Sequence, residues 1–500
     1  MNKKFRVCVL GGGTSGQIAA LILKCRFFEN IEVDIIKSDK VGIVGVGEGS
    51  TEHWKEFTDF VGIDPYELIT KTDATLKGAI MFDGWGNKKY LHNTIPEFSK
   101  LKFGQLHAAY LLMLKNNSPF ESIVDPLLYN SKIRSLIRPK NNKNKLLPVN
   151  QFHFNALKLN NFLEEKCKDR EITCITDEIL DVTLNNKGEI DTLKGKKQNY
   201  NNYDLFIDCT GFKKLLISKL GAKWISYNKY LHTNEAIAFP TKDTDEYPLY
   251  TLSKTLNYGW MWRTPTYGRW GNGYVYNNNY INADQAQKEV EKIIGHEVEI
   301  FKNIKFDPGC LDKVWIKNCV AMGLSASFIE PLEASSLASI IQQSFLLIHQ
   351  LPNFNEKIVD QYNNKISAMN RNIRDFICLH FYVKKDNSQF WKDIQKVKLP
   401  DTLQNQLEIW KNRLPIKEDF SETEYLIYNP HNFILTLYGL DLINTNELKK
   451  HYNLLNENLK SEVELTVISL QTLLKNELHT IGHKQVLTEI RKYYENSITE

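Results

Sequence analysis

The sequence predicts an α/β protein that begins with a Rossmann-type βαβ unit, and two observations predict this. Residues 7–10 are a short apolar run, typical of a buried parallel strand, and residues 31–36 predict a second parallel strand. Between them, the glycine-rich turn 11–16 opens into the apolar helical stretch 18–23. A strand, a G-x-G-x-x-G turn, a helix and a second strand follow in the order that a dinucleotide-binding unit requires.

The residues of this turn predict a nucleotide cofactor. Gly11 permits a tight turn, Gly13 lets the backbone approach a pyrophosphate, and Gly16 lets the helix pack on the strand. Thr14 and Ser15 lie at the start of the helix, where free N–H groups and the positive end of the helix dipole favour phosphate.

The end of the second strand departs from the usual pattern. An acidic residue normally stands there and binds the ribose hydroxyls of the cofactor. This chain has Lys37 at that position, with Asp39 two residues further on. Either Asp39 binds the ribose or other groups hold it.

Composition narrows the class of protein. A chain of 500 residues is long enough for two or three domains, and its 63 basic and 59 acidic residues give a net charge of only +4, which does not indicate a nucleic-acid partner. The eight cysteines contain no C-x-x-C pair, so we expect free thiols in a reducing compartment and no metal site. The first strand begins almost at the amino terminus and no apolar run reaches membrane-spanning length, so we expect a cytoplasmic protein with no membrane partner.

Two features of the next segment each allow two interpretations. The glycine-spaced run 41–51, which contains Gly47 and Glu48, is either a capped tight turn or a second backbone loop over a flavin ring. Lys77 lies within the apolar run 74–80, where burying an ammonium costs several kcal/mol unless it has a partner. The alternative is a surface lysine whose head reaches solvent.

The middle of the chain favours FAD as the cofactor. Residues 84–150 have no clean periodicity and predict an irregular insertion that covers a substrate cavity. His153, in an apolar context, is expected to be a hydrogen-bonded core histidine rather than a catalyst. The β-run 203–208 is followed by Cys-Thr-Gly, which ends at Gly211. A glycine at this position again lets a ligand or another backbone segment approach closely. A second strand facing a dinucleotide so late in the chain favours FAD over a simple NAD domain.

Two later motifs complete the pattern. Trp260 and Trp262 stand two apart, so on a strand they point to one face and either fill a core or form a wall between two cavities. Residues 333–336 precede a helical stretch at 337–351, a position that favours an anion or is an ordinary capped helix start. From residue 352 onward the sequence predicts helices joined by short loops.

Taken together, these segments resemble the flavin-dependent tryptophan halogenase family, within the flavin monooxygenase superfamily. The resemblance runs from the amino terminus to about residue 391. It is carried by the glycine-rich turn, residues 45–48, 74–77 and 208–212, the two tryptophans, residues 318–321 and 330–333, and residues 374–376 with His380 and 390–391.

The resemblance implies a fold and a reaction. It implies a flavin monooxygenase-like α/β (α+β) core with a substrate-facing β-sheet at residues 1–345, and a mainly helical C-terminal region at 346–500 that completes the substrate site. It implies that FADH2 from a separate flavin reductase reacts with O2 and halide to give hypohalous acid, which halogenates a small aromatic substrate. A homo-oligomer is also expected.

The resemblance also implies roles for individual residues. Lys77 binds or carries the electrophilic halogen, and Glu333 assists its activation or removes the ring proton. The remaining positions are cofactor contacts at Gly11, Gly13, Thr14, Ser15, Gly16, Asp39, Gly47, Glu48, Gly211 and Leu332, halide contacts at Ser335 and Ser336, a partition between flavin and substrate at Trp260, Trp262 and Pro265, and substrate contacts at His92 and Phe433.

The chain departs from the family pattern at three places. Thr264 replaces an isoleucine of the W-x-W-x-I-P motif, and Glu-Ser-Thr-Gly becomes Glu-Ala-Ser-Ser at 333–336. The second change predicts a preference for bromide or iodide over chloride, because larger halides are easier to desolvate and oxidise. Phe433 stands where a substrate-stacking tryptophan is expected, so another indole or a phenol is an equal alternative to free tryptophan.

Two other functions compete with a halogenase. An FAD-dependent aromatic hydroxylase shares the cofactor motifs but needs neither the tryptophan pair nor Lys77. A non-catalytic flavin-binding module would hold FAD without turnover when reduced flavin is supplied.

Overall fold

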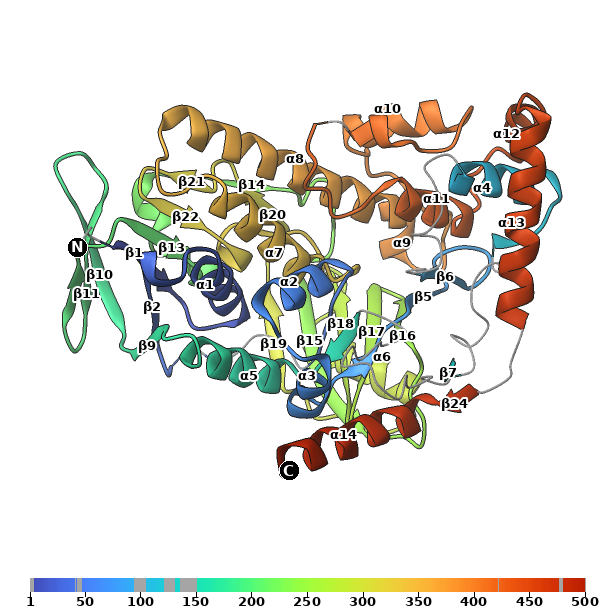
Figure 1. Ribbon diagram of the computed structural model, residues 1–500. Helices are drawn as coiled ribbons and strands as arrows, with labels where there is room; N and C mark the ends of the chain where they lie inside the picture. The colour runs from blue at the N-terminus through green and yellow to red at the C-terminus, as the bar shows by residue number, and fades with distance from the viewer. Residues whose placement is uncertain are drawn as a thin grey trace.

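A computed structural model provides the structure of the chain, and it describes residues 4–40, 42, 47–93, 105–120, 131–134, 151–420, 422–475 and 480–499. Much of the expected insertion at 84–150, and Gly45 with Val46 of the 45–48 motif, lie outside these residues. The mixed α/β class predicted from the sequence is confirmed, and the last third of the chain is mainly helical (Figure 1).

A six-stranded sheet forms the first layer, in the order β21-β22-β13-β1-β2-β9. The strand β1 pairs in parallel with both β2 and β13, so the two predicted cofactor-facing strands are direct neighbours. Their carboxyl ends therefore lie at one edge of the sheet, where ligands of such folds bind. The strands are β1 (Phe5–Leu10), β2 (Ile31–Lys37), β9 (Thr173–Thr176), β13 (Leu205–Asp208), β21 (Trp315–Ile316) and β22 (Cys319–Ala321).

The helix α1 (Thr14–Phe27) packs on this sheet. The helices α5 (Ala156–Lys168) and α7 (Ser335–Ile348) pack against α1. Residues 16–23 of α1 are all buried, which explains why its sequence is apolar on every side rather than on one stripe. A Cβ on Gly16 would lie 2.1 Å from the carbonyl oxygen of Gly11. Only glycine permits this close packing of helix on strand, as the sequence pattern predicts.

A seven-stranded sheet forms the second layer, in the order β19-β15-β18-β17-β16-β5-β6. The strand β17 carries both tryptophans, and Lys77 lies between the short strand β4 and β5. The strands of this layer are β5 (Ala79–Asp83), β6 (Tyr90–Asn93), β15 (Glu235–Lys242), β16 (Tyr250–Leu256), β17 (Gly259–Thr266), β18 (Arg269–Tyr276) and β19 (Lys302–Lys305).

A small three-stranded sheet connects the two layers. Its central strand β8 (Phe152–Phe154) pairs with β3 (Glu48–Gly49) on one side and with β4 (Thr75–Leu76) on the other. The glycine-spaced segment and the lysine segment are thereby placed next to each other. His153 on β8 is buried, and both of its ring nitrogens lie within 3.0 Å of threonine hydroxyls, those of Thr75 and Thr251, as expected of a core histidine.

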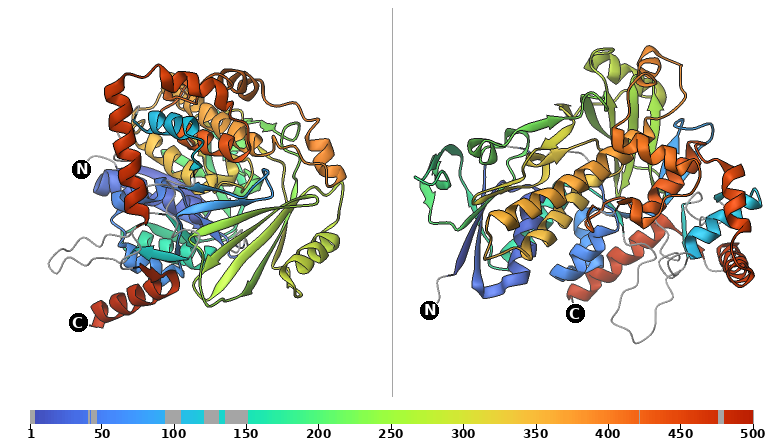
Figure 2. Two further views of the ribbon diagram at one scale, coloured as in Figure 1. Left: turned by 90° about the vertical axis from the view of Figure 1, so that its right-hand side faces the viewer. Right: turned by 90° about the horizontal axis from the view of Figure 1, so that it is seen from above.

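The remaining elements surround these sheets. The helices α12 and α13 pack against α4 at one end of the molecule, whereas α14 lies against α3 at the lower edge (Figures 1 and 2). The helices are α2 (His53–Val61), α3 (Pro65–Thr72), α4 (Gln105–Lys115), α6 (Ala283–Ile294), α8 (Glu356–His380), α9 (Gln389–Ile394), α10 (Asp401–Trp410), α11 (Pro430–Gly439), α12 (Thr445–Asn453), α13 (Glu457–Lys475) and α14 (His483–Thr499). The remaining strands are β7 (Lys132–Arg134), β10 (Ile179–Leu184), β11 (Ile190–Gly195), β12 (Asn199–Asn201), β14 (Trp224–Ser226), β20 (Gly309–Leu311), β23 (Ser327–Phe328) and β24 (Thr480–Gly482).

The expected division at residue 345/346 stays a prediction, and its boundary falls inside α7. In the described part of the chain, no helix has the length and apolar character needed to cross a membrane. The eight cysteines are free thiols. Among the same described residues, no group of three His, Cys, Asp or Glu side chains gathers as metal ligands would.

Candidate active site

A cavity of about 810 Å³ lies at the carboxyl ends of β1, β2 and β13. It brings together residues that are far apart in the sequence, including both predicted glycine loops. The predicted cofactor contacts that line it are Gly11, Gly13, Thr14, Ser15, Asp39, Gly47, Glu48, Gly211 and Leu332. Gly16 supports this wall from beneath, through its packing against Gly11.

The backbone around this cavity fits a dinucleotide such as FAD. Gly11 has a φ of +123°, and a Cβ there would lie 2.2 Å from the carbonyl oxygen of Cys209. A Cβ on Gly13 would meet no atom within 4 Å, so the backbone there is open to a ligand. No side chain caps the amino terminus of α1, whose first N–H groups are thus available to phosphate oxygens.

The structure adds a carboxylate that the sequence pattern did not indicate. Lys37 forms an ion pair with Glu164 of α5 at 2.6 Å, and both residues line the cavity near Asp39. Glu164 is 127 positions from Lys37 in the sequence, so no local motif could have revealed it. Asp39 and Glu164 are thus two of the acidic side chains in the wall of this cavity.

A sharp turn at Ala334 separates two functions of the 333–336 segment. Ala334 adopts a left-handed backbone conformation with φ +55°, which residues other than glycine rarely adopt. Ser335 and Ser336 line the large cavity at the first turn of α7, where no side chain caps the helix. Glu333 points instead into a second, much smaller cavity. The predicted halide contacts and the predicted acid–base group therefore lie on opposite sides of one turn.

Both tryptophans of β17 line the large cavity, with ring centroids 6.1 Å apart. Trp260 is buried, and its indole N–H donates to the Glu330 carboxylate at 3.2 Å. Burial raises the pKa of Glu330 to about 7, although hydrogen bonds from Thr233 and Trp260 oppose this shift. Pro265 does not line the cavity; its carbonyl oxygen accepts a hydrogen bond of 2.8 Å from Thr75 and so joins β17 to the lysine segment.

Lys77 lies in the second cavity and is only 2% exposed, so the surface-lysine interpretation is wrong. Its Nζ donates a hydrogen bond of 2.7 Å to the carbonyl oxygen of Ser50. Burial lowers the pKa of Lys77 to about 8, while the charges of Glu333 and Glu52 act in the opposite direction. Lys77 is therefore easier to deprotonate than an exposed lysine, and its neutral fraction grows as the pH rises towards 8.

Two histidines hold Glu333 in its ionised form. Its oxygens lie 2.8 and 3.0 Å from Nδ1 of His92, and Nε2 of His380 lies 2.9 Å away. Burial alone would raise the pKa of Glu333, but His92 and His380 outweigh it and lower the pKa to about 2. The cavity thus contains a carboxylate able to accept a proton, beside an amine with a lowered pKa.

Of the two predicted substrate contacts, His92 lies beside Lys77 and Glu333, and Phe433 does not. His92 lines the small cavity, and its Nε2 lies 2.8 Å from the side-chain amide of Asn432. Phe433, in contrast, is packed in an aromatic cluster with Phe376, Trp410 and Phe420 and does not line this cavity. The helix α11 turns Asn432 inward and Phe433 away. Sequence reasoning also missed the position of His380 beside Glu333, since it lies on the distant helix α8.

Gly49 brings the wall of the large cavity next to Lys77. It lines that cavity, and a Cβ on Gly49 would lie 3.3 Å from Nζ of Lys77 and 3.6 Å from Cβ of Ala334. Ile80 lines both cavities.

Comparison with known proteins agrees with this geometry. The tryptophan halogenase family model matches residues 6–453. The tryptophan 6-halogenase SttH of Streptomyces toxytricini is 27% identical over 474 residues, covering 88% of this chain and 90% of that protein. The tryptophan 7-halogenase KtzQ of Kutzneria sp. is 27% identical, covering 83% of both chains.

Solved structures show the same fold over nearly the whole chain. A tryptophan halogenase from Shewanella frigidimarina has a TM-score of 0.88 and 27% identity, covering 98% of each chain. The structure of SttH has a TM-score of 0.85 and covers 97% of this chain and 99% of that chain. The chain therefore belongs to the tryptophan halogenase family and is a flavin-dependent halogenase, an oxidoreductase that uses FADH2.

Proposed function

We propose that this enzyme makes hypohalous acid in the large cavity and transfers its halogen, through Lys77, to an indole bound next to Lys77 and Glu333. The observation that carries the proposal is the buried amine of Lys77, which lies next to the ionised Glu333 and borders Gly49 in the wall of the dinucleotide cavity. Binding of the aromatic substrate beside Lys77 would keep it from the flavin and favour halogen transfer over direct oxygen transfer.

The residues of the large cavity would bind the cofactor and the halide. The glycine turn and the start of α1 would hold the FAD pyrophosphate, with Asp39 or Glu164 at the ribose. Ser335 and Ser336 would hold halide against the uncapped start of α7. Bound FADH2, reacting with O2, supplies the two-electron oxidation of halide to hypohalous acid. A separate flavin reductase in the cytoplasm, and a homo-oligomeric enzyme, belong to the same proposal.

Lys77 would carry the halogen to the substrate. Its neutral amine attacks the halogen of hypohalous acid, which gives a haloamine and water. The ring carbon then attacks that halogen, the nitrogen keeps the electron pair of the broken bond, and the ring proton leaves. Glu333, kept ionised by His92 and His380, accepts this proton and passes it to the nitrogen, which restores the neutral amine and the carboxylate. The net products are the halogenated ring and the free amine.

The substrate we propose is an indole, and free tryptophan is the first one to test. The names of the curated relatives support tryptophan, since they are tryptophan halogenases. Asn432 and His92 supply the polar contacts on the substrate side of the cavity. Because Phe433 packs away from this cavity, stacking by residue 433 is not part of the proposal.

The experiment that tests the function supplies enzymatically reduced FAD, O2 and halide with a panel of indoles and phenols, and reads products by mass spectrometry. We expect an indole, tryptophan first, to replace one hydrogen by halogen. Equal concentrations of chloride and bromide in the same reaction test the halide preference. We expect the brominated product to dominate because Ala334–Ser336 reshapes the halide contacts; a chlorinated product in excess would contradict that preference.

Substituting Gly49→Val should block transfer without stopping hypohalous acid formation. The new side chain would lie against Nζ of Lys77 and Cβ of Ala334, and it would obstruct the route that we propose from the large cavity to Lys77. We expect halogenated product to fall by at least about tenfold, the effect of a displacement much smaller than 1 Å at a reacting group. A hypohalous acid trap such as monochlorodimedone should consume the missing halogen in solution. Unchanged product would show that halogen reaches Lys77 by another route.

A further inference from the structure

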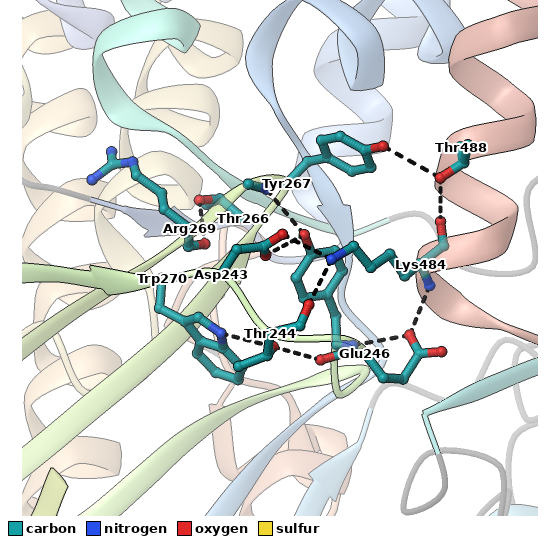
Figure 3. A network of polar contacts seen from close by, with 11 residues as sticks. Asp243, Thr244, Glu246, Thr266, Tyr267, Arg269, Trp270, Lys484 and Thr488 are labelled. Carbon is teal, nitrogen blue, oxygen red and sulfur yellow. Dashed lines mark hydrogen bonds and ion pairs between the residues drawn. The ribbon is translucent and has the colours of Figure 1, made fainter. Parts of the chain in front are cut away.

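The carboxyl-terminal helix α14 lies outside residues 6–453, the part of the chain that matches the family. It nevertheless returns to the seven-stranded sheet, preceded by β24, which pairs with β7. In Figure 3 its first turns face the loop before β16 and the turn between β17 and β18. The helix is therefore placed close to the segment that carries Lys77.

The first residue of α14 binds the backbone immediately before Lys77. The amide N–H of Leu76 donates a hydrogen bond of 3.0 Å to Nε2 of His483, and the Nδ1 of the same ring lies 3.2 Å from the carbonyl oxygen of Tyr247. His483 is completely buried, and this burial lowers its pKa to about 4. The ring is therefore neutral, with its proton on Nδ1 and its Nε2 free to accept the bond from Leu76.

The amides of Lys77 and of the next residue, Gly78, bind backbone carbonyl groups instead. The N–H of Lys77 donates to the carbonyl oxygen of Gln151 at 2.9 Å, and that of Gly78 donates to Leu249 at 2.6 Å. Among these three successive amides, only that of Leu76 is held by a side chain. The backbone on which the Lys77 side chain is mounted is thus fixed on one side by the sheet and on the other by His483.

Several contacts hold α14 against the sheet at a distance from Leu76. The Glu246 carboxylate accepts the backbone N–H of Lys484 at 2.7 Å, and Nζ of Lys484 donates to Asp243 at 2.7 Å (Figure 3). Two turns further on, Arg491 donates to the Asp73 carboxylate at 2.7 Å. The helix therefore contacts residues 73–76 at two points, Asp73 and Leu76, just before the catalytic lysine.

We propose that His483 is a positioning residue for Lys77, which it serves by holding the Leu76 amide and so fixing where the amine stands relative to Glu333 and Gly49. This inference rests on the proposed function. His483 lies beyond residues 6–453, the part of the chain that matches the family, and it would keep the Lys77 amine at the correct position relative to the substrate. A displacement of a reacting group by 1 Å costs about 10²-fold in rate, so a lost contact at Leu76 is enough to uncouple the two cavities.

The test compares three variants with the wild type in the reaction with reduced FAD, O2, bromide and the indole that the wild type accepts. His483→Phe keeps a buried ring but cannot accept from Leu76. His483→Gln can still accept from Leu76 and donate to Tyr247. Lys484→Gln loses the ion pair with Asp243 in the same helix and does not contact Leu76. Two quantities are measured for each: halogenated product, and hypohalous acid captured by monochlorodimedone in its absence.

We expect His483→Phe to form hypohalous acid at the wild-type rate and to lose at least tenfold in product per hypohalous acid formed. We expect His483→Gln to recover most of this ratio and Lys484→Gln to leave it unchanged. A merely structural role would lower both quantities together, so the ratio separates the two. An unchanged ratio in His483→Phe, or an equal loss in Lys484→Gln, would overturn the inference. If the wild type forms no hypohalous acid, the proposed function fails instead.

If His483→Phe does not fold, His483→Leu, which is smaller and also cannot accept from Leu76, takes its place, and hydrogen exchange of the Leu76 amide is measured in each folded variant. We expect this amide to lose protection in His483→Leu together with the product ratio, and to keep wild-type protection in His483→Gln and Lys484→Gln. Loss of protection at Leu76 in His483→Gln with an unchanged product ratio would contradict a positioning role.

Discussion

Substituting Lys77→Arg is expected to abolish halogenation while hypohalous acid formation continues. Arginine keeps the positive charge and the hydrogen-bonding capacity of lysine, but its guanidinium remains protonated at every working pH and cannot form the haloamine. Lys77, by contrast, has a pKa lowered to about 8 by burial, so raising the pH through 8 increases its neutral fraction. Product by mass spectrometry and trapped hypohalous acid are measured together.

Lys77→Met is the matched control, because it keeps an unbranched, buried side chain and has no charge. Both variants should release hypohalous acid at the wild-type rate and give product below detection. If Lys77→Arg kept its product, a positive hydrogen-bond donor would suffice at this position, and the haloamine step would be wrong.

Substituting Glu333→Gln should lower the rate of product formation by about 10²- to 10⁴-fold, the range typical of a lost acid–base group. The amide keeps the size of the carboxylate and its position between His92 and His380, but it cannot take the ring proton. Hypohalous acid formation should not change, since Glu333 faces the small cavity and not the large one.

The pH profile provides the control for Glu333. Because its pKa is about 2, the carboxylate is ionised throughout the neutral range, and the wild-type rate should show no loss attributable to Glu333 between pH 6 and 8. A Glu333→Asp variant should recover part of the rate. Full activity in Glu333→Gln would mean that another group takes the proton.

The sequence was sufficient for those parts of the fold whose determinants are local. The strand–turn–helix at β1 and α1 follows from apolar runs and from Gly11 and Gly16, whose lack of a side chain the packing requires. The two tryptophans on one face of β17 follow from strand periodicity. Segments whose role depends on distant partners were not predictable in this way, and the contact between α14 and β4 spans more than four hundred residues.

The same difference between local motifs and distant partners explains which parts of the candidate site could be predicted from the sequence. Lys77 and Glu333 were identified because their motifs lie in short, recognisable segments. Their chemistry, however, is set by His380 on α8, Asn432 on α11 and His483 on α14, each far away in the sequence. Phe433 shows the limit of positional analogy, since the neighbouring residue of the same helix, Asn432, is the one that faces the cavity.

The most direct test of the central claim is the mass of the product formed from tryptophan by the full-length enzyme with reduced FAD, O2 and bromide, with Lys77→Met alongside. The account predicts replacement of one hydrogen by bromine in the wild type and no such product in the variant. A product that gains only oxygen, and forms equally well in Lys77→Met, would contradict it.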